Sequence, residues 1–159
     1  MEMNTIEITI HEDEFPDRKI PRSTAQTKRF NFKTGNFFDS EKLRTARNFY
    51  TYIFNRERIN RSGEFPITGP IVVEIYFYYK TSKKKEIGEP KTTRPDLDNS
   101  VKLCIDCLMS ANVIKDDGQI FMLYTTKKWW YEEKLVIKIS FPEERDILTD
   151  LEEYGECQI

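Results

Sequence analysis

The chain has 159 residues, a length typical of one domain, and its 38% hydrophobic and 13% aromatic content is enough for a buried core. With 25 Lys and Arg against 27 Asp and Glu, the net charge of −2 does not by itself indicate a nucleic-acid partner. The sequence lacks a run of about 18 apolar residues and a basic, apolar leader, so we expect a cytoplasmic protein without a membrane segment. Its three cysteines are too few for a disulfide scaffold and are expected to be reduced.

The first third of the chain predicts one strand and one helix. Residues 5–10 alternate between apolar and polar side chains, which is typical of a strand with one buried face. Residues 11–38 show no sustained period and are expected to form a long loop. Asp39 or Ser40 caps a helix that runs to about Arg58, because the apolar positions after the cap follow helical spacing.

The middle of the chain predicts a strand, a basic loop and a second helix. Residues 71–80 are rich in β-branched and aromatic side chains and predict the strand. The basic loop leads to a helix that begins at Asp96 or Asp98, with apolar residues at positions i, i+3, i+4 and i+7. Asp98, Lys102 and Asp106 fall on the opposite stripe, so one face of this helix is apolar and the other is ionic.

The last part of the chain predicts two strands and a tail. Residues 116–118 form a turn, and residues 119–131 and 134–141 are strands that we expect to pair as a hairpin. The pattern predicts an α/β (α+β) fold, with a mixed sheet packed by helices in a single domain of residues 1–142. The acidic tail, residues 143–159, is compatible with a short helix.

Two acidic pairs bracket the second helix, Asp96 with Asp98 before it and Asp116 with Asp117 after it. Alone, each pair has a structural explanation, because carboxylates cap helix N-termini and Asp is common in turns. The helix is only about 15 to 18 Å long, so the strand that follows can return beside its start and gather the four carboxylates. Like charges about 4 Å apart repel, so the cluster needs cations or protons, and oxygen ligands favour Mg²⁺ or Mn²⁺ over Zn²⁺.

Enzymes that hydrolyse phosphodiester bonds use metal sites of this kind. Lys102 lies one helical turn after Asp98, where its ammonium can stabilise the negative charge of the transition state. The alternative is an ordinary ion pair between Asp98 and Lys102 on a solvated helix face. The residues alone leave both interpretations open.

This combination resembles the RusA-type Holliday junction resolvases, metal-dependent endodeoxyribonucleases of bacteria and their phages. The resemblance covers about residues 70–141 and is carried by Asp96-Leu97-Asp98-Asn99, Lys102, Asp106, Leu108, Asp116-Asp117 and Gln119-Ile120. It implies that Asp96, Asp98 and Asp117 bind Mg²⁺, with Mn²⁺ as a substitute, and that Lys102 is catalytic. Asp116 and Asn99 would support these ligands as their neighbours.

The resemblance also implies a homodimer that resolves four-way DNA junctions in recombination and repair, encoded by a bacterium or a prophage. The basic residues expected to contact DNA phosphates are Lys83, Lys84, Lys85, Lys91 and Arg94. Pro95 departs from the pattern of the best-known member, which has an arginine there, so we expect Arg94 and Lys91 to replace that contact.

Other interpretations have specific weaknesses. A non-catalytic DNA-binding module of the same fold would use its carboxylates only as helix caps. A glycosyltransferase, whose metal motif is also Asp-x-Asp, usually needs a longer chain with a nucleotide-binding framework. Cys104 and Cys107 have the spacing of a zinc or redox pair, but they lie inside a helix with Cys104 facing the core. Trp129 and Trp130 either pack in the sheet or stack on bases.

Overall fold

The computed structural model of the chain describes residues 3–22 and 28–142. Its strands, helices and short 3-10 turns are, in chain order, β1 (Met3–His11), η1 (Pro16–Arg18), β2 (Lys28–Asn31), β3 (Asn36–Asp39), α1 (Glu41–Ile59), β4 (Ile71–Lys80), η2 (Lys84–Glu86), α2 (Leu97–Ser110), η3 (Asp117–Gln119), β5 (Ile120–Trp130) and β6 (Lys134–Pro142). Among these residues no helix is both long enough and apolar enough to cross a membrane. The helix predicted within residues 143–159 lies outside the described residues.

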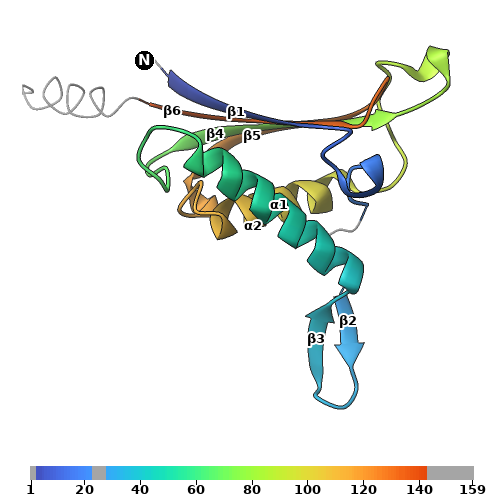
Figure 1. Cartoon of the computed structure of the whole chain (residues 1–159), viewed down its shortest axis with the longest axis horizontal. Helices are drawn as coiled ribbons and strands as arrows, with labels where there is room; N and C mark the ends of the chain where they lie inside the picture. Colours follow the sequence, from blue (N-terminus) through green and yellow to red (C-terminus); the bar gives the residue numbers. More distant parts are fainter. Residues whose placement is uncertain (1–2, 23–27, 143–159) are drawn as a thin grey trace, which may run out of the picture.

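The main sheet is mixed, with strand order β1-β6-β4-β5, and β2 with β3 forms a separate small sheet. The central strand β4 runs antiparallel to β6 and parallel to β5. Its odd-numbered residues from Ile71 to Tyr79 are at most 1% exposed, while the residues between them are half-buried. Both helices lie on one face of this sheet (Figure 1), so the predicted α+β architecture is confirmed as two packed layers.

The predicted hairpin of β5 and β6 is wrong, because β4 lies between these two strands. Tyr76 of β4 is opposite Thr126 of β5 on one side and opposite Val136 of β6 on the other. Residues 131–133 therefore cross two strand spacings of about 4.8 Å each, which three extended residues can just span. Parallel β4 and β5 need a long crossover, and residues 81–119, which contain α2, provide it.

The predicted loop between β1 and α1 contains regular structure that the sequence pattern did not reveal. Phe30 of β2 is opposite Phe37 of β3, and both are exposed. The turn between the strands is closed by a hydrogen bond from the Gly35 amide to the Asn31 carbonyl at 2.9 Å. In these strands of four residues the rings of Phe30 and Phe37 face solvent, so no alternation of buried and exposed positions was there for periodicity to indicate.

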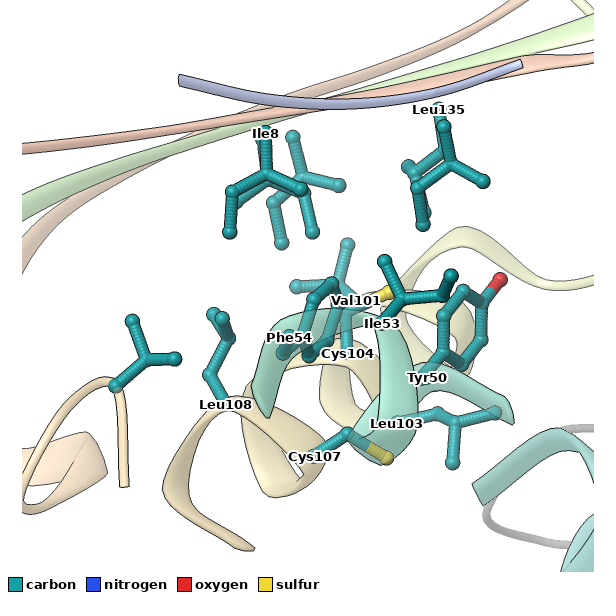
Figure 2. Packing of buried hydrophobic residues seen from close by; sticks show 14 of the residues in the cluster. Ile8, Tyr50, Ile53, Phe54, Val101, Leu103, Cys104, Cys107, Leu108 and Leu135 are labelled. Atoms are coloured by element: carbon teal, nitrogen blue, oxygen red, sulfur yellow. The ribbon is translucent and has the colours of Figure 1, made fainter. Parts of the chain in front are cut away.

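The core lies between the sheet and the two helices (Figure 2). The predicted cap of α1 is confirmed at Ser40, whose hydroxyl accepts a hydrogen bond from the Leu43 amide at 3.2 Å. One face of α1, including Tyr50 and Phe54, is buried against the sheet and α2. The corresponding face of α2 includes Leu108 and packs into the same core.

Cys104 and Cys107 are buried free thiols in this core (Figure 2). Burial raises the pKa of Cys104 well above its usual value and that of Cys107 to about 11. Both thiols are therefore protonated at neutral pH, so the fold supports a packing role for them and not a zinc or redox role.

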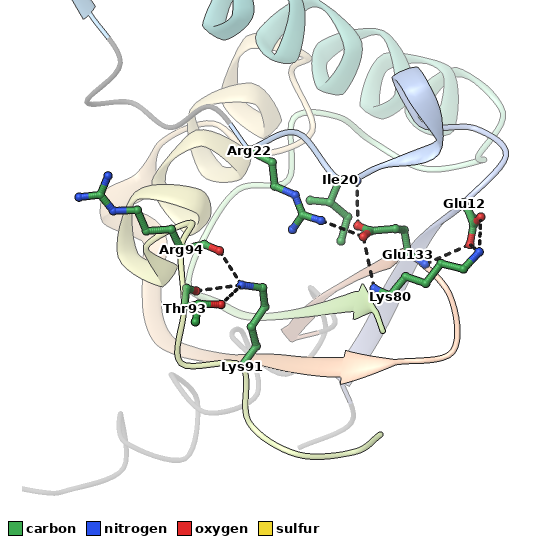
Figure 3. Close-up of polar contacts among 8 residues, drawn as sticks. All are labelled: Glu12, Ile20, Arg22, Lys80, Lys91, Thr93, Arg94 and Glu133. Carbon is green, nitrogen blue, oxygen red and sulfur yellow. Dashed lines mark hydrogen bonds and ion pairs between the residues drawn. The ribbon is translucent and has the colours of Figure 1, made fainter. Parts of the chain in front are cut away.

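A buried carboxylate joins the N-terminal segment to the end of the sheet (Figure 3). Glu133 is 2% exposed and accepts hydrogen bonds from the Ile20 amide at 3.0 Å, the Lys80 amide at 3.2 Å and the Arg22 guanidinium at 2.9 Å. The Arg22 guanidinium also lies 4.3 Å from the centre of the Tyr79 ring. These contacts fix the chain after β1 over the end of β4.

Candidate active site

The loop before α2 is held by two lysines (Figure 3 shows the first). The ammonium of Lys91 donates to the carbonyls of Thr93, at 3.0 Å, and Arg94, at 2.5 Å. The ammonium of Lys127, on β5, donates to the carbonyls of Thr93 and Pro95, both at 2.7 Å. Burial lowers the pKa of both lysines, and the nearby Asp96 carboxylate opposes this effect at Lys127. These bonds define the position at which α2 begins.

Lys91 has a structural role in this arrangement and not the predicted phosphate contact. It is 5% exposed, and its ammonium lies 4.6 Å from the centre of the Trp129 ring and 5.2 Å from that of Tyr79. An ammonium that is buried and hydrogen-bonded to the chain is not available to a phosphate. Arg94, in contrast, is exposed at the same loop.

The start of α2 presents two exposed carboxylates. Asp96 is the N-cap residue, and its carbonyl accepts hydrogen bonds from the Ser100 amide at 3.1 Å and the Ser100 hydroxyl at 2.9 Å. Within the described residues, the Asp96 carboxylate makes no capping hydrogen bond, so helix capping does not explain this side chain. Asp98 lies in the first turn and is exposed, whereas its neighbour Asn99 is buried.

The second acidic pair occupies η3, which is held by side chains. The Asp116 carboxylate accepts the Gly118 amide at 2.7 Å, and a Cβ at Gly118 would lie only 2.7 Å from the same oxygen. The Gln119 side-chain oxygen accepts the Asp116 amide at 2.8 Å, and its nitrogen donates to the Gly69 carbonyl at 2.7 Å. The Asp116 carboxylate therefore shapes the turn and leaves the exposed Asp117 carboxylate beside it.

The two acidic segments meet at one cavity of about 740 Å³ between α2 and β5. Its charged lining residues are Asp98, Lys102, Asp106 and Asp117, and the rest of the lining is mainly apolar. The predicted return of the chain to the start of α2 is thus observed for Asp98 and Asp117. The predicted convergence is incomplete, because among residues 3–22 and 28–142 no three carboxylate, His or Cys groups stand close enough to hold an ion as they are oriented here. Asp96 lies at the same helix end but outside the cavity lining.

Lys102 is paired with Asp106 and not with Asp98. The Lys102 ammonium lies 3.8 Å from one Asp106 oxygen, and the Arg47 guanidinium lies 3.7 Å from the other. Arg47 also contacts Asp39 at 2.9 Å, so a row of alternating charges leads from the end of β3 through α1 to the cavity. The Lys102 side chain is 61% exposed, and the residue lines the cavity.

The basic loop after β4 gives an exposed cationic surface. Lys84 and Lys85 are exposed, and the Lys83 ammonium pairs with Glu86 at 2.8 Å. Thus four of the five predicted phosphate contacts, Lys83, Lys84, Lys85 and Arg94, are accessible.

Sequence reasoning missed most of the residues that position the site. Asp106 was placed on the ionic stripe of α2, four residues after Lys102, but its pairing with Lys102 was not predicted. The contacts of Arg47 with Asp106, of Gln119 with Gly69 and of Lys127 with Pro95 join residues 32 or more positions apart, so no local spacing could indicate these contacts.

The donor chemistry fits a hard divalent cation. The exposed side chains available at this helix end are the oxygen donors Asp96, Asp98 and Asp117, which Mg²⁺ and Mn²⁺ prefer. Capping does not occupy the Asp96 carboxylate in the described structure, and Asp98 and Asp117 line one cavity. Asp96, Asp98 and Asp117 are therefore the candidate metal-binding residues of this site.

Comparisons with known proteins identify the family of this chain. Residues 20–140 match the family model described as Endodeoxyribonuclease RusA. Over 71 residues the chain is 35% identical to the crossover junction endodeoxyribonuclease rusA of Lactococcus phage r1t, a match that covers 45% of this chain and 54% of the relative. The matched stretch thus spans about half of that relative's length. Because the family model spans most of the chain and includes both acidic segments, the chain belongs to the RusA endodeoxyribonuclease family.

Proposed function

We propose that this protein is a structure-specific endodeoxyribonuclease that resolves four-way (Holliday) junctions during DNA recombination and repair in the cytoplasm. The observation that carries the proposal is the shared cavity of Asp98, Lys102 and Asp117 in a chain of the RusA family. A non-catalytic DNA-binding module would use the Asp96 carboxylate to cap α2, but this carboxylate makes no capping hydrogen bond in the described structure.

The proposed reaction is hydrolysis of one phosphodiester bond in each of two strands. Asp96, Asp98 and Asp117 would hold Mg²⁺, for which Mn²⁺ can substitute, and the ion would activate water and stabilise the leaving oxygen. The Lys102 ammonium would stabilise the added negative charge on the phosphoryl group. Water adds its oxygen to phosphorus, the bond to the 3′ oxygen breaks, and the products carry a 5′-phosphate and a 3′-hydroxyl.

A homodimer matches the approximate two-fold symmetry of a four-way junction, which must be cut in two strands. The free edge of β5 supports this assembly. Segment 88–91 hydrogen-bonds to the second half of β5, at Lys127 and Trp129, and no such cover lies beside residues 121–126 in the described part of the chain. The uncovered half carries four consecutive exposed apolar side chains, Phe121, Met122, Leu123 and Tyr124. An open strand edge with this composition favours pairing with a second copy.

The test is cleavage of a synthetic four-way junction with and without Mg²⁺. The wild-type protein should give paired symmetric nicks only with the metal, and Asp98→Asn should lower the rate by roughly 10²-fold or more while junction binding is retained. Asp13→Asn, at an exposed carboxylate of another region, is the matched control and should cut normally. Cutting by Asp98→Asn at the wild-type rate would reject the mechanism.

Calorimetry with Mn²⁺ distinguishes the nuclease from a non-catalytic module. A nuclease site should bind the ion, and Asp96→Asn should weaken that binding. A module that uses its carboxylates only structurally should bind no Mn²⁺ that depends on Asp96.

A further inference from the structure

The hairpin of β2, β3 and their turn, residues 28–39, carries exposed aromatic side chains that the proposed chemistry does not use. This aromatic hairpin projects from the body of the molecule at the start of α1 (Figure 1). The Phe30 ring packs against Phe32 at 5.0 Å and against Phe37 at 5.1 Å between ring centres. Phe32 is 91% exposed and Phe37 is 71% exposed. Three apolar rings grouped in solvent on one small element are typical of a binding surface.

The tip of the aromatic hairpin is ordered by its own hydrogen bonds. The Asn31 side chain accepts the Lys33 amide at 2.9 Å, and the Asn31 carbonyl accepts the Gly35 amide at 2.9 Å. Gly35 has a φ of +69°, a conformation that glycine adopts without strain. Because the rings stand on a closed turn, little conformational freedom is lost when they bind a ligand.

The charge around the rings indicates an anionic ligand. Arg29 and Lys33 are exposed on the hairpin, and the sequence has no acidic residue from position 28 to position 38. The acidic residue that follows, Asp39, is paired with Arg47. Two copies of this hairpin would bring like charges together, which disfavours self-association through it. An unpaired DNA base presents a flat apolar face next to a phosphate, so it matches aromatic rings that lie beside cationic side chains.

We propose that the aromatic hairpin binds unstacked bases at the branch point of the DNA substrate, with the phenylalanine rings on the bases and Arg29 and Lys33 on neighbouring phosphates. The base of the hairpin connects through Asp39 and Arg47 to Asp106, which lines the cavity, so the hairpin begins close to the candidate active site. The hairpin then selects branched DNA, where stacking is interrupted, over continuous duplex. This inference rests on the proposed function for its substrate.

The test measures binding without divalent ions to three DNAs: a four-way junction, a continuous duplex of equal length, and a single-stranded oligothymidylate. The variant Phe32→Ala/Phe37→Ala removes two mainly exposed rings and should fold normally. Tyr52→Ala, which removes a ring that is 65% exposed on α1, is the matched control. The double variant should lose about tenfold or more in affinity for the junction and the oligothymidylate, while its duplex affinity and the control's affinities stay within about twofold.

Equal losses on all three DNAs, or no loss on any, would overturn the role of the rings. Light scattering of the same variant provides a second readout, because a change in oligomeric state would assign the rings to a contact between copies. If the wild-type protein fails to nick junctions with Mg²⁺, the proposed function fails. The oligothymidylate measurement still decides the hairpin proposal in that case, because it requires no cleavage.

Discussion

Single carboxylates at the end of the sheet hold distant parts of the chain together. Glu133 joins the chain after β1 to the end of β4, and Glu12 accepts two hydrogen bonds from the Lys80 ammonium at 2.9 and 3.1 Å (Figure 3). The Lys80 contact holds the pKa of Glu12 below its ordinary value of 4.5. Because the folded protein favours the ionised carboxylate, folding is more favourable when this group is charged.

We therefore expect a pH-dependent effect of Glu12→Gln on stability. The Glu12 contribution is complete above the unfolded-state pKa of about 4.5, and it disappears as the pH falls through the lower pKa of the folded state. Thermal unfolding followed by circular dichroism should give a Tm for the variant roughly 1 to 3 °C below wild type near pH 7. The difference should shrink as the pH falls below 4.5 and should close once the pH lies below the lowered pKa of folded-state Glu12. Glu64→Gln, at an exposed carboxylate, should show no such convergence, and a constant Glu12→Gln difference would contradict the assignment.

At the scale of elements, β5 positions the start of α2. Lys127 reaches from β5 to the carbonyls of Thr93 and Pro95, immediately before Asp96. η3, at the start of the same strand, presents Asp117 from a turn fixed by Gln119. One strand thus sets the position of both acidic segments.

We expect Lys127→Met to weaken metal binding by misplacing Asp96 and Asp98. The variant loses two hydrogen bonds to the loop, and residues that orient metal ligands typically contribute about 10- to 100-fold in metal affinity. Calorimetry with Mn²⁺ should show this loss, and Lys127→Arg should restore part of it. Lys128→Met, at the adjacent position on the opposite face of β5, is the control. A lower Tm with unchanged Mn²⁺ affinity would mean that Lys127 serves stability alone.

At the scale of the whole molecule, the open half of the β5 edge lies next to the cavity, since Leu123 lines the cavity and belongs to the exposed group. A second copy paired at this edge would bring two cavities close together. The distance between the two cuts in the DNA would then be set by the distance between the two cavities of the dimer, which a single chain does not define.

We expect the protein to have twice its chain mass of 19.0 kDa in solution and Met122→Asp to have the single-chain mass. A charge placed among the exposed apolar residues of β5 would be desolvated by pairing, which disfavours the dimer. Light scattering with size-exclusion chromatography measures both masses, and Tyr52→Asp on α1 should leave the dimer intact. A dimeric Met122→Asp variant would exclude this edge as the interface.

The sequence by itself determined both helices, the four strands of the main sheet and the candidate site residues, but not the small hairpin of β2 and β3. The β-branched and aromatic composition of residues 71–80 predicted a strand with the bounds later observed, and Ser40 was one of two expected caps for α1. The shortness of the second helix predicted that the chain returns to the start of that helix, and Asp98 and Asp117 do line one cavity, whereas Asp96 lies outside its lining. These features depend on local periodicity and on the length of a single helix.

Only the tertiary structure decided which strands lie side by side and which side chains are in contact. Periodicity records which face of a strand is buried but not which strand lies beside it, so the position of β4 between β5 and β6 was unpredictable from alternation. Lys91 appeared as a surface cation in a basic loop, yet packing around Tyr79 and Trp129 buries it. The pairing of Lys102 with Asp106, reinforced by Arg47 from another helix, likewise depends on how α1 and α2 pack. Burial and long-range contacts are properties of the assembled layers, because the groups that create them come together only when the chain has folded.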